Sequence, residues 1–309
     1  MNYFREWSVA AVLAILLLVL AVVAPAFFQA QPLLSLAAHE APMLVVTGGM
    51  ALVILCRHID ISVGSQFAVC GVSAGLLAAQ NCPLPLVAMA SIIAGAVLGA
   101  INGGLIAGLR LPSIVVTLAT MVSWREGLRW WRQGQFVDLP DGMQWIGLSQ
   151  RAGQGVLIGV AIVIFVGLAV ALRTLAVGRW IYAVGSDEEA ARLAGIRPRW
   201  VTFGVFVAMG ALAGLAAAMN AVQSPQVDPK SGTGLELSAI AAVVVGGVAI
   251  SGGRGNLWGV FAGGLLLACV APALTFLHVE AYWSRAIEGA IILLAVVADG
   301  VRSRKKHRG

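Results

Sequence analysis

Residues 84–109 read LPLVAMASIIAGAVLGAINGGLIAGL, a run without a single charged side chain. At 1.5 Å per residue, a helix of this length exceeds the roughly 30 Å thickness of a bilayer's hydrocarbon core. The apolar residues follow one another without interruption, whereas the strands of an outer-membrane barrel alternate polar and apolar residues. The run therefore predicts a membrane-spanning α-helix.

The composition of the whole chain agrees with this interpretation. Its 309 residues are 60% hydrophobic and only 11% charged, against about 45–50% and 25% in an ordinary soluble domain. A soluble globule has too few polar side chains here to cover its apolar surface. We therefore exclude a cytosolic enzyme and expect an all-α membrane protein, a polytopic bundle forming a single domain over residues 1–309.

A window of about twenty residues predicts about ten transmembrane helices. The predicted spans are 7–29, 41–56, 64–80, 84–109, 113–131, 153–174, 200–221, 237–250, 257–277 and 285–300. Spans 41–56 and 237–250 are short or rich in glycine, so broken or re-entrant helices are alternatives there. A cleaved signal peptide is the alternative for span 7–29, where we prefer an uncleaved anchor.

Glycines recur at four-residue spacing within several predicted spans, which puts them on one face of a helix. The sets are Gly95, Gly99 and Gly103; Gly104 and Gly108; Gly210 and Gly214; and Gly259 and Gly263. Such faces let two helix backbones approach closely. We therefore expect these positions to serve helix packing.

The charge distribution predicts the orientation in the membrane. With ten crossings both termini lie on one side. Placing them in the cytoplasm puts fourteen of the 20 lysines and arginines on that side, as the positive-inside rule requires. We expect a multi-pass protein of the bacterial inner membrane whose basic residues meet lipid, not nucleic acid.

A short helix is predicted inside the polar segment 186–198. Ser186 and Glu189 have the spacing of a capping box, Gly195 is suited to a C-terminal stop, and Pro198 prevents continuation. About eight residues are far too few to cross a bilayer. The helix therefore either lies on the cytosolic face of its own protein or is presented to a cytosolic partner.

Four stretches, in order along the chain, resemble the permeases of ATP-binding cassette importers in the branch of the ribose and related monosaccharide permeases. Residues 188–196, EEAARLAGI, resemble the coupling helix of that family. The others are residues 59–65, IDISVGS; residues 111–121, LPSIVVTLATM, after Ile101-Asn102-Gly103; and residues 232–237, GTGLEL, leading to 239–247, AIAAVVVGG. Arg57-His58 stands where the family often has two glycines, which is closer to the autoinducer-2 and rhamnose members.

The resemblance implies a transport subunit that works with partners. Two permease chains, identical or related, would form the pathway, two cytosolic ATP-binding cassette subunits would drive it, and a periplasmic binding protein would deliver a monosaccharide or related small hydroxylated solute. The residues expected to couple to the ATPase are Glu188, Glu189, Ala190, Ala191, Arg192 and Gly195. No lysine follows a glycine here, as a phosphate-binding loop requires, so we expect no ATPase site and no enzymatic activity.

Polar residues within or beside the apolar spans are candidates for the pathway or its gate. The carboxylate of Asp60 costs free energy beside an apolar span unless it is paired with a cation or hydrated. We favour a structural role for it at a bend, with Arg57 or His58 as its partner. Ser62, Asn102 and Thr117 belong to the same set, and hydrogen bonding between helices is the alternative for Asn102 and Thr117. The cysteines and histidines are too scattered for a metal site, and we assign no cofactor.

A secondary transporter or channel for a small polar solute, without coupling to ATP, is the alternative function. Proton coupling normally requires ionisable residues deep in the spans, and most spans here have none at their middle. An intramembrane enzyme is disfavoured because the chain contains no GxSxG or HExxH motif. The solute, whether ribose, rhamnose, autoinducer-2 or another, is left open.

Overall fold

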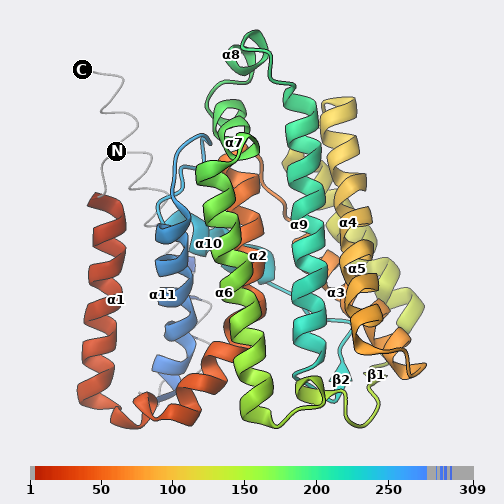
Figure 1. Cartoon of the computed structure of the whole chain (residues 1–309), viewed down its shortest axis with the longest axis vertical. Coiled ribbons are helices and arrows are strands. Elements are labelled where there is room, and N and C mark those ends of the chain that lie inside the picture. The colour runs from red at the N-terminus through yellow and green to blue at the C-terminus, as the bar shows by residue number, and fades with distance from the viewer. Residues whose placement is uncertain (1–3, 277–282, 284–285, 288, 291–292, 294–309) are drawn as a thin grey trace.

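The structure is a computed structural model that describes residues 4–276, 283, 286–287, 289–290 and 293 (Figure 1). Most of the predicted span 285–300 lies outside the described residues. The long helices run roughly along the longest axis of the molecule. They are α1 (Phe4–Val23), α2 (Ala30–Leu55), α4 (Leu84–Leu109), α5 (Ser113–Arg132), α6 (Gln150–Thr174), α9 (Pro198–Ala221) and α11 (Leu257–Phe276).

Shorter elements connect the long helices. They are η1 (Pro25–Phe28), α3 (Val63–Ala79), β1 (Val137–Asp138), η2 (Gln144–Gly147), α7 (Ala176–Ser186), α8 (Glu188–Leu193), β2 (Gln226–Val227) and α10 (Leu235–Val245). The strands β1 and β2 pair antiparallel, with Val137 opposite Val227. This pair lies at one end of the molecule, and α7 and α8 lie at the other (Figure 1).

Five described helices are long and apolar enough to cross a membrane, namely α2, α4, α6, α9 and α11. This is fewer than the ten predicted spans. The segment 41–56 is part of the unbroken helix α2, which contains Pro42. By contrast, α10 has 11 residues, or about 16 Å, which is too short to cross. Span 237–250 is thus a broken segment, as the alternative interpretation allowed.

The outward faces of the long helices are apolar. Val97 on α4, Val115 on α5 and Val163 on α6 are exposed to the surroundings. Large apolar surfaces of this kind are rare on soluble monomers and are what hydrocarbon accepts. The arrangement confirms the predicted class of a mostly helical membrane protein.

Helix α2 forms the centre of the bundle, because the half that ends at Leu55 is almost entirely buried and packs against α6, α9, α10 and α11. Helices α4 and α9 pack more closely than any other pair among the described residues. A Cβ atom at Gly95 would overlap the carbonyl oxygen of Gly210, and one at Gly214 would overlap that of Ser91. The predicted packing role is confirmed for these glycines. It is wrong for Gly104 and Gly108, where an added Cβ meets no atom of the described residues within 4 Å.

Candidate functional site

Helix α8 has six residues and projects from one end of the molecule (Figure 1). It begins where the Asp187 carboxylate accepts hydrogen bonds from the backbone N–H groups of Glu189, at 2.9 Å, and Ala190, at 3.0 Å. It ends before Gly195, whose φ of +83° is the left-handed conformation that commonly stops a helix. The short capped helix predicted from the sequence is therefore present.

The capping residue differs from the prediction. Asp187 caps α8, whereas Ser186 is the last residue of α7 and its hydroxyl donates to the carbonyl oxygen of Gly253 at 3.4 Å. The physical reason is the close contact of Gly185 with another segment, described below, which keeps α7 helical up to Ser186. Asp187 is then the first residue with the extended backbone that a cap requires.

Most of the predicted coupling residues face outward. Glu188, Glu189, Ala190, Arg192 and Gly195 are exposed, whereas Ala191 is buried against the protein's own core. Arg192 and Glu189 form an ion pair at 2.5 Å, but both side chains are more than half exposed, so the pair contributes little stability. These charges are therefore available to a partner.

Leu193 is a feature of this surface that the sequence did not single out. It lies at the end of α8, close to four charged residues, and is 81% exposed. The sequence contained no signal for this orientation, because a helix of six residues is too short for its apolar face to be read from periodicity. We call the exposed residues Glu188, Glu189, Ala190, Arg192, Leu193 and Gly195 the α8 face.

Helix α7 joins the α8 face to the central helix of the bundle. A Cβ atom at Gly185 would overlap the carbonyl oxygen of Leu55, the last residue of α2, and would lie 2.8 Å from the backbone nitrogen of Gly253. The N–H of Gly253 in turn donates to that same Leu55 oxygen at 2.9 Å. We call this contact of Leu55, Gly185 and Gly253 the α7 junction.

A tyrosine strengthens the α7 junction. The Tyr182 hydroxyl donates to the carbonyl oxygen of Gly255 at 3.0 Å. Burial raises the pKa of Tyr182, so the hydroxyl keeps its proton and remains a donor at neutral pH. Backbone groups from three separate segments therefore meet at α7, which packs the end of this helix directly against the end of α2.

The loop that leaves this end of α2 carries the buried carboxylate of Asp60, which is fully inaccessible. Ser62 donates to its Oδ1 through the backbone N–H at 2.9 Å and the hydroxyl at 2.5 Å. Gln66, in the first turn of α3, donates its Nε2 to Oδ2 at 3.0 Å. The carboxylate thus fixes the turn from the loop into α3, which agrees with the structural role favoured for it.

Two neighbouring helices complete this set of hydrogen bonds. The Nδ2 of Asn102 on α4 donates to the Ser62 hydroxyl at 2.8 Å, and the Thr120 hydroxyl on α5 donates to the Oδ1 of Asn102 at 2.9 Å. We call Asp60, Ser62, Gln66, Asn102 and Thr120 the Asp60 network. Three of the four predicted pathway residues belong to it.

The fourth predicted residue, Thr117, lies beside the network. Its hydroxyl donates to the Ser113 carbonyl of its own helix at 2.8 Å and lies 3.4 Å from the carbonyl oxygen of Ile59. Its carbonyl oxygen lies 3.3 Å from the Thr120 hydroxyl. Thr117 therefore contacts the network through its own backbone and through the backbone next to Asp60.

The predicted ionic partner of Asp60 is wrong. Arg57 is exposed, and the Nε2 of His58 lies 3.3 Å from the Thr202 hydroxyl on α9, with its ring 5.8 Å from that of Phe206. The partners of Asp60 are the neutral residues Ser62 and Gln66. The sequence interpretation missed Gln66, and it also missed Thr120, which joins the network through Asn102. Gln66 offered a signal, since it is a polar residue in the first turn of an otherwise apolar helix.

The Asp60 network retains unused hydrogen-bonding capacity. The Oε1 of Gln66 is buried and has no hydrogen-bond partner in the part of the chain that the structure describes. An unpartnered buried acceptor costs free energy, so this group favours a nearby donor such as a hydroxyl or water. Among the described residues no three His, Cys, Asp or Glu side chains gather, and we assign no residue to a metal.

A cavity of about 520 Å³ lies toward the end of the molecule opposite α8. Most of its lining is apolar, but six polar side chains border it, and we call it the polar cavity for these side chains. It is bordered by Asn220, near the end of α9, and by the segment that enters α10. Its polar side chains are His39, Glu40, Asn220, Ser231, Thr233 and Ser238. Hydroxyl, amide and carboxylate groups of this kind are suited to hydrogen bonding with a small hydroxylated solute.

The comparisons with known proteins agree with these features. The chain matches, over residues 32–296, a family described as "Branched-chain amino acid transport system / permease component". That range contains the α8 face, the α7 junction and the Asp60 network.

Several curated proteins are similar over most of their length. The chain is 36% identical over 302 residues to "Autoinducer 2 import system permease protein LsrC" of Enterobacter sp. (strain 638), covering 96% of this chain and 87% of the relative. It is 33% identical to the protein of the same name in Escherichia coli (strain K12 / DH10B), covering 93% and 86%. No solved structure matches the chain.

Proposed function

Because this chain belongs to the family of branched-chain amino acid transport system permease components, we propose that it forms the inner-membrane pathway of an ATP-binding cassette importer. Its autoinducer 2 import relatives place it with the sugar-type permeases of the ribose branch. Permeases of these importers are transport components without an ATPase site of their own. The energy for transport therefore comes from separate subunits.

The proposed solute is a monosaccharide or a related small hydroxylated molecule, such as autoinducer 2, delivered by a periplasmic binding protein. The names of the relatives support this class. The polar cavity supports it as well, because hydroxyl and amide groups line a space open to a small molecule. Importers of this kind pair two permease chains, so we propose that a second chain, a copy or a relative, completes the pathway.

The α8 face is the observation that carries the proposal. It presents Glu188, Glu189, Ala190, Arg192 and Gly195, together with Leu193, at one end of the bundle. We propose that this end is cytoplasmic, with both chain termini on the same side. We also propose that each of two ATP-binding cassette subunits binds the α8 face of one permease chain. Closure of the ATPases then displaces α8 as a rigid body.

The α7 junction gives that displacement a physical route. Moving α7 shifts Gly185 against Leu55 and so shifts the end of α2. The loop from α2 to Asp60 would shift with it. This shift would change the hydrogen bond from Ser62 to Asp60 and the one from Asn102 to Ser62. We propose that the Asp60 network, with Thr117 beside it, responds as a gate between two arrangements, as alternating access requires.

Replacing Glu188 and Glu189 with glutamine is expected to lower ATP-driven uptake about tenfold, since charges at a docking surface mainly set partner binding. The measurement is uptake of labelled solute into proteoliposomes containing the permease, the ATPase and the binding protein. Glu126→Gln is the matched control, because Glu126 also forms an exposed pair with an arginine three residues on, Arg129.

Two outcomes contradict the proposal. Equal losses for the Glu126 and the Glu188/Glu189 variants would show that α8 has no special role. Uptake that continues without any ATPase would instead favour a secondary transporter or channel.

Leu193→Ser is expected to weaken binding of the ATPase subunit about tenfold, because burying a leucine contributes roughly 1.5–3 kcal/mol. The thermal stability of the permease itself should stay unchanged, since the side chain is 81% exposed. Binding of purified ATPase to immobilised permease measures the effect. Leu148→Ser, at an exposed apolar site outside α8, is the control, and equal binding by both variants would exclude Leu193 from the docking surface.

A further inference from the structure

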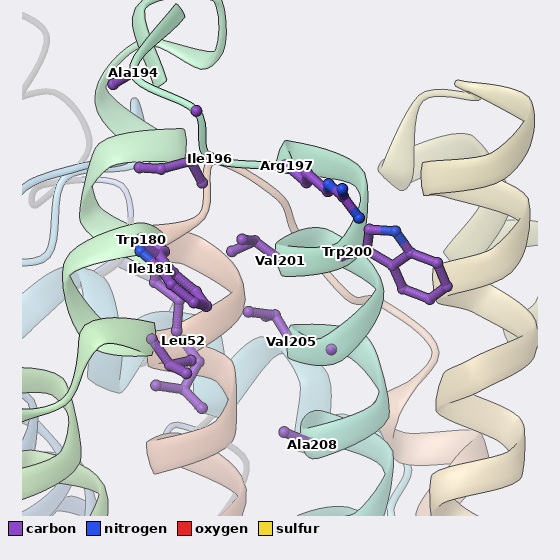
Figure 2. A pocket seen from close by; sticks show the side chains of 13 residues that line it. Leu52, Trp180, Ile181, Ala194, Ile196, Arg197, Trp200, Val201, Val205 and Ala208 are labelled. Carbon is purple, nitrogen blue, oxygen red and sulfur yellow. The ribbon is translucent and has the colours of Figure 1, made fainter. Parts of the chain in front are cut away.

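An open groove lies between α7 and α9, next to the α8 face (Figure 2). Its volume is about 760 Å³. Ile181 of α7 forms one wall, Val201 and Val205 of α9 form the other, and Leu52 of α2 contributes from between them. Among the described residues that line the groove, Arg197 alone carries a charge.

The lining excludes the transported solute as the occupant. A hydroxylated molecule placed between Leu52, Ile181 and Val205 would lose its hydrogen bonds to water and gain none in return. An alkyl chain, by contrast, would bury apolar surface on both sides. The groove is therefore suited to hydrocarbon, which distinguishes it from the polar cavity at the other end of the molecule.

The length of the groove matches one leaflet of a bilayer. Its lining runs from Arg197, just before α9, to Ala208 on α9, a rise of eleven residues or about 16 Å. Half of the hydrocarbon core of a bilayer is about 15 Å. An acyl chain entering beside Arg197 would therefore reach the bilayer midplane near Ala208.

The mouth of the groove has the side chains of a membrane interface. Trp200 is 67% exposed and Trp180 is 44% exposed, and tryptophan is enriched at the level of lipid headgroups. Figure 2 shows Arg197 and Trp200 extending together from the start of α9, with Trp180 on α7 across the groove.

We propose that the groove between α7 and α9 binds an acyl chain of an anionic phospholipid whose phosphate group contacts Arg197. The guanidinium group presents several N–H donors that match phosphate oxygens. The lipid would lie against α7, the helix that joins the α8 face to α2.

The first test fills the groove. Gly204 lines it, is exposed, and has no atom of the described chain within 4 Å of an added Cβ, so the side chain of Gly204→Leu would start in open space and take up part of the groove. Gly108→Leu is the matched control, since Gly108 on α4 is equally open and lies outside the groove. Native mass spectrometry of the full chain, with phosphatidylglycerol and phosphatidylcholine supplied equally, counts the retained lipids.

Wild type and Gly108→Leu are expected to retain phosphatidylglycerol in preference to phosphatidylcholine. Gly204→Leu should retain about tenfold less of it, the loss expected when two methylene groups leave an apolar contact. Equal retention by the two leucine variants would overturn the proposal. So would a loss of association between permease chains in Gly204→Leu with lipid retention unchanged, because a second protein chain would then be the occupant.

The second test removes the charge. Arg197→Gln is expected to lower the preference for phosphatidylglycerol over phosphatidylcholine about fivefold, the contribution of one basic residue near an anionic membrane surface. Arg199→Gln is the control, because Arg199 lies two residues further along α9 and does not line the groove. No preference in the wild type, or equal effects of the two variants, would overturn the role given to Arg197.

Discussion

Gly185→Ala is expected to abolish ATP-driven uptake and to lower the thermal unfolding midpoint of the chain. The added Cβ would overlap the Leu55 carbonyl oxygen and approach the Gly253 nitrogen at 2.8 Å. Both are backbone atoms, which cannot rotate away as a side chain can. We therefore expect the free energy of unfolding to fall by about 3 kcal/mol, the upper end of the range for overpacking. Thermal unfolding of the purified chain and uptake in proteoliposomes measure the two effects.

Gly204→Ala separates this effect from a general cost of replacing a helical glycine. Gly204 is also in a helix near the same end of the molecule, and an added Cβ there meets no atom within 4 Å. Alanine at this position should be neutral or slightly stabilising. If Gly185→Ala behaves like Gly204→Ala, the α7 junction is not tight enough to transmit movement from α8 to α2.

Asp60→Ala is expected to destabilise the chain by about 3–5 kcal/mol, because it leaves several buried donors without an acceptor. The donors are the backbone N–H and hydroxyl of Ser62 and the side-chain amide of Gln66. The turn from α2 into α3 should loosen, and uptake should fall with it. Thermal or denaturant unfolding and uptake assays measure the effect.

Asp60→Asn is the informative companion variant. Its side-chain oxygen still accepts from Ser62, and rotation of the Gln66 amide offers the otherwise unpartnered Oε1 to the new amide donor. We expect a cost of only about 1 kcal/mol. Equal destabilisation by Asn and Ala would contradict the hydrogen-bonding account, whereas normal stability with lost uptake would assign the negative charge to transport.

The helical membrane class could be predicted from the sequence because apolar runs such as residues 84–109 need no tertiary information to be recognised. The glycine faces of α4 and α9 were predictable for the same reason, since four-residue spacing is a local property. The boundaries of broken segments could not be predicted in this way. Whether span 237–250 continues or stops at Val245 depends on the turn and the packing that follow it.

The candidate site was predictable only in part. Ser186 and Asp187 both carry a side-chain oxygen suited to capping, and the choice between them is made by the contact of Gly185 with Leu55, which is distant in sequence. The Asp60 network likewise includes Asn102, which donates to Ser62 from forty positions further along the chain. Local patterns identified the important segments, while long-range packing determined which atoms meet.

The contact between α4 and α9 limits how this protein can change shape. Carbonyl oxygens of each helix lie where the other has no side chain, with Gly95 against Gly210 and Ser91 against Gly214. Sliding one helix along the other by a single residue would drive a Cβ atom into a carbonyl oxygen. We therefore expect the two helices to keep their relative position as one rigid unit, and we expect the opening and closing of the pathway to arise between this unit and the elements around it.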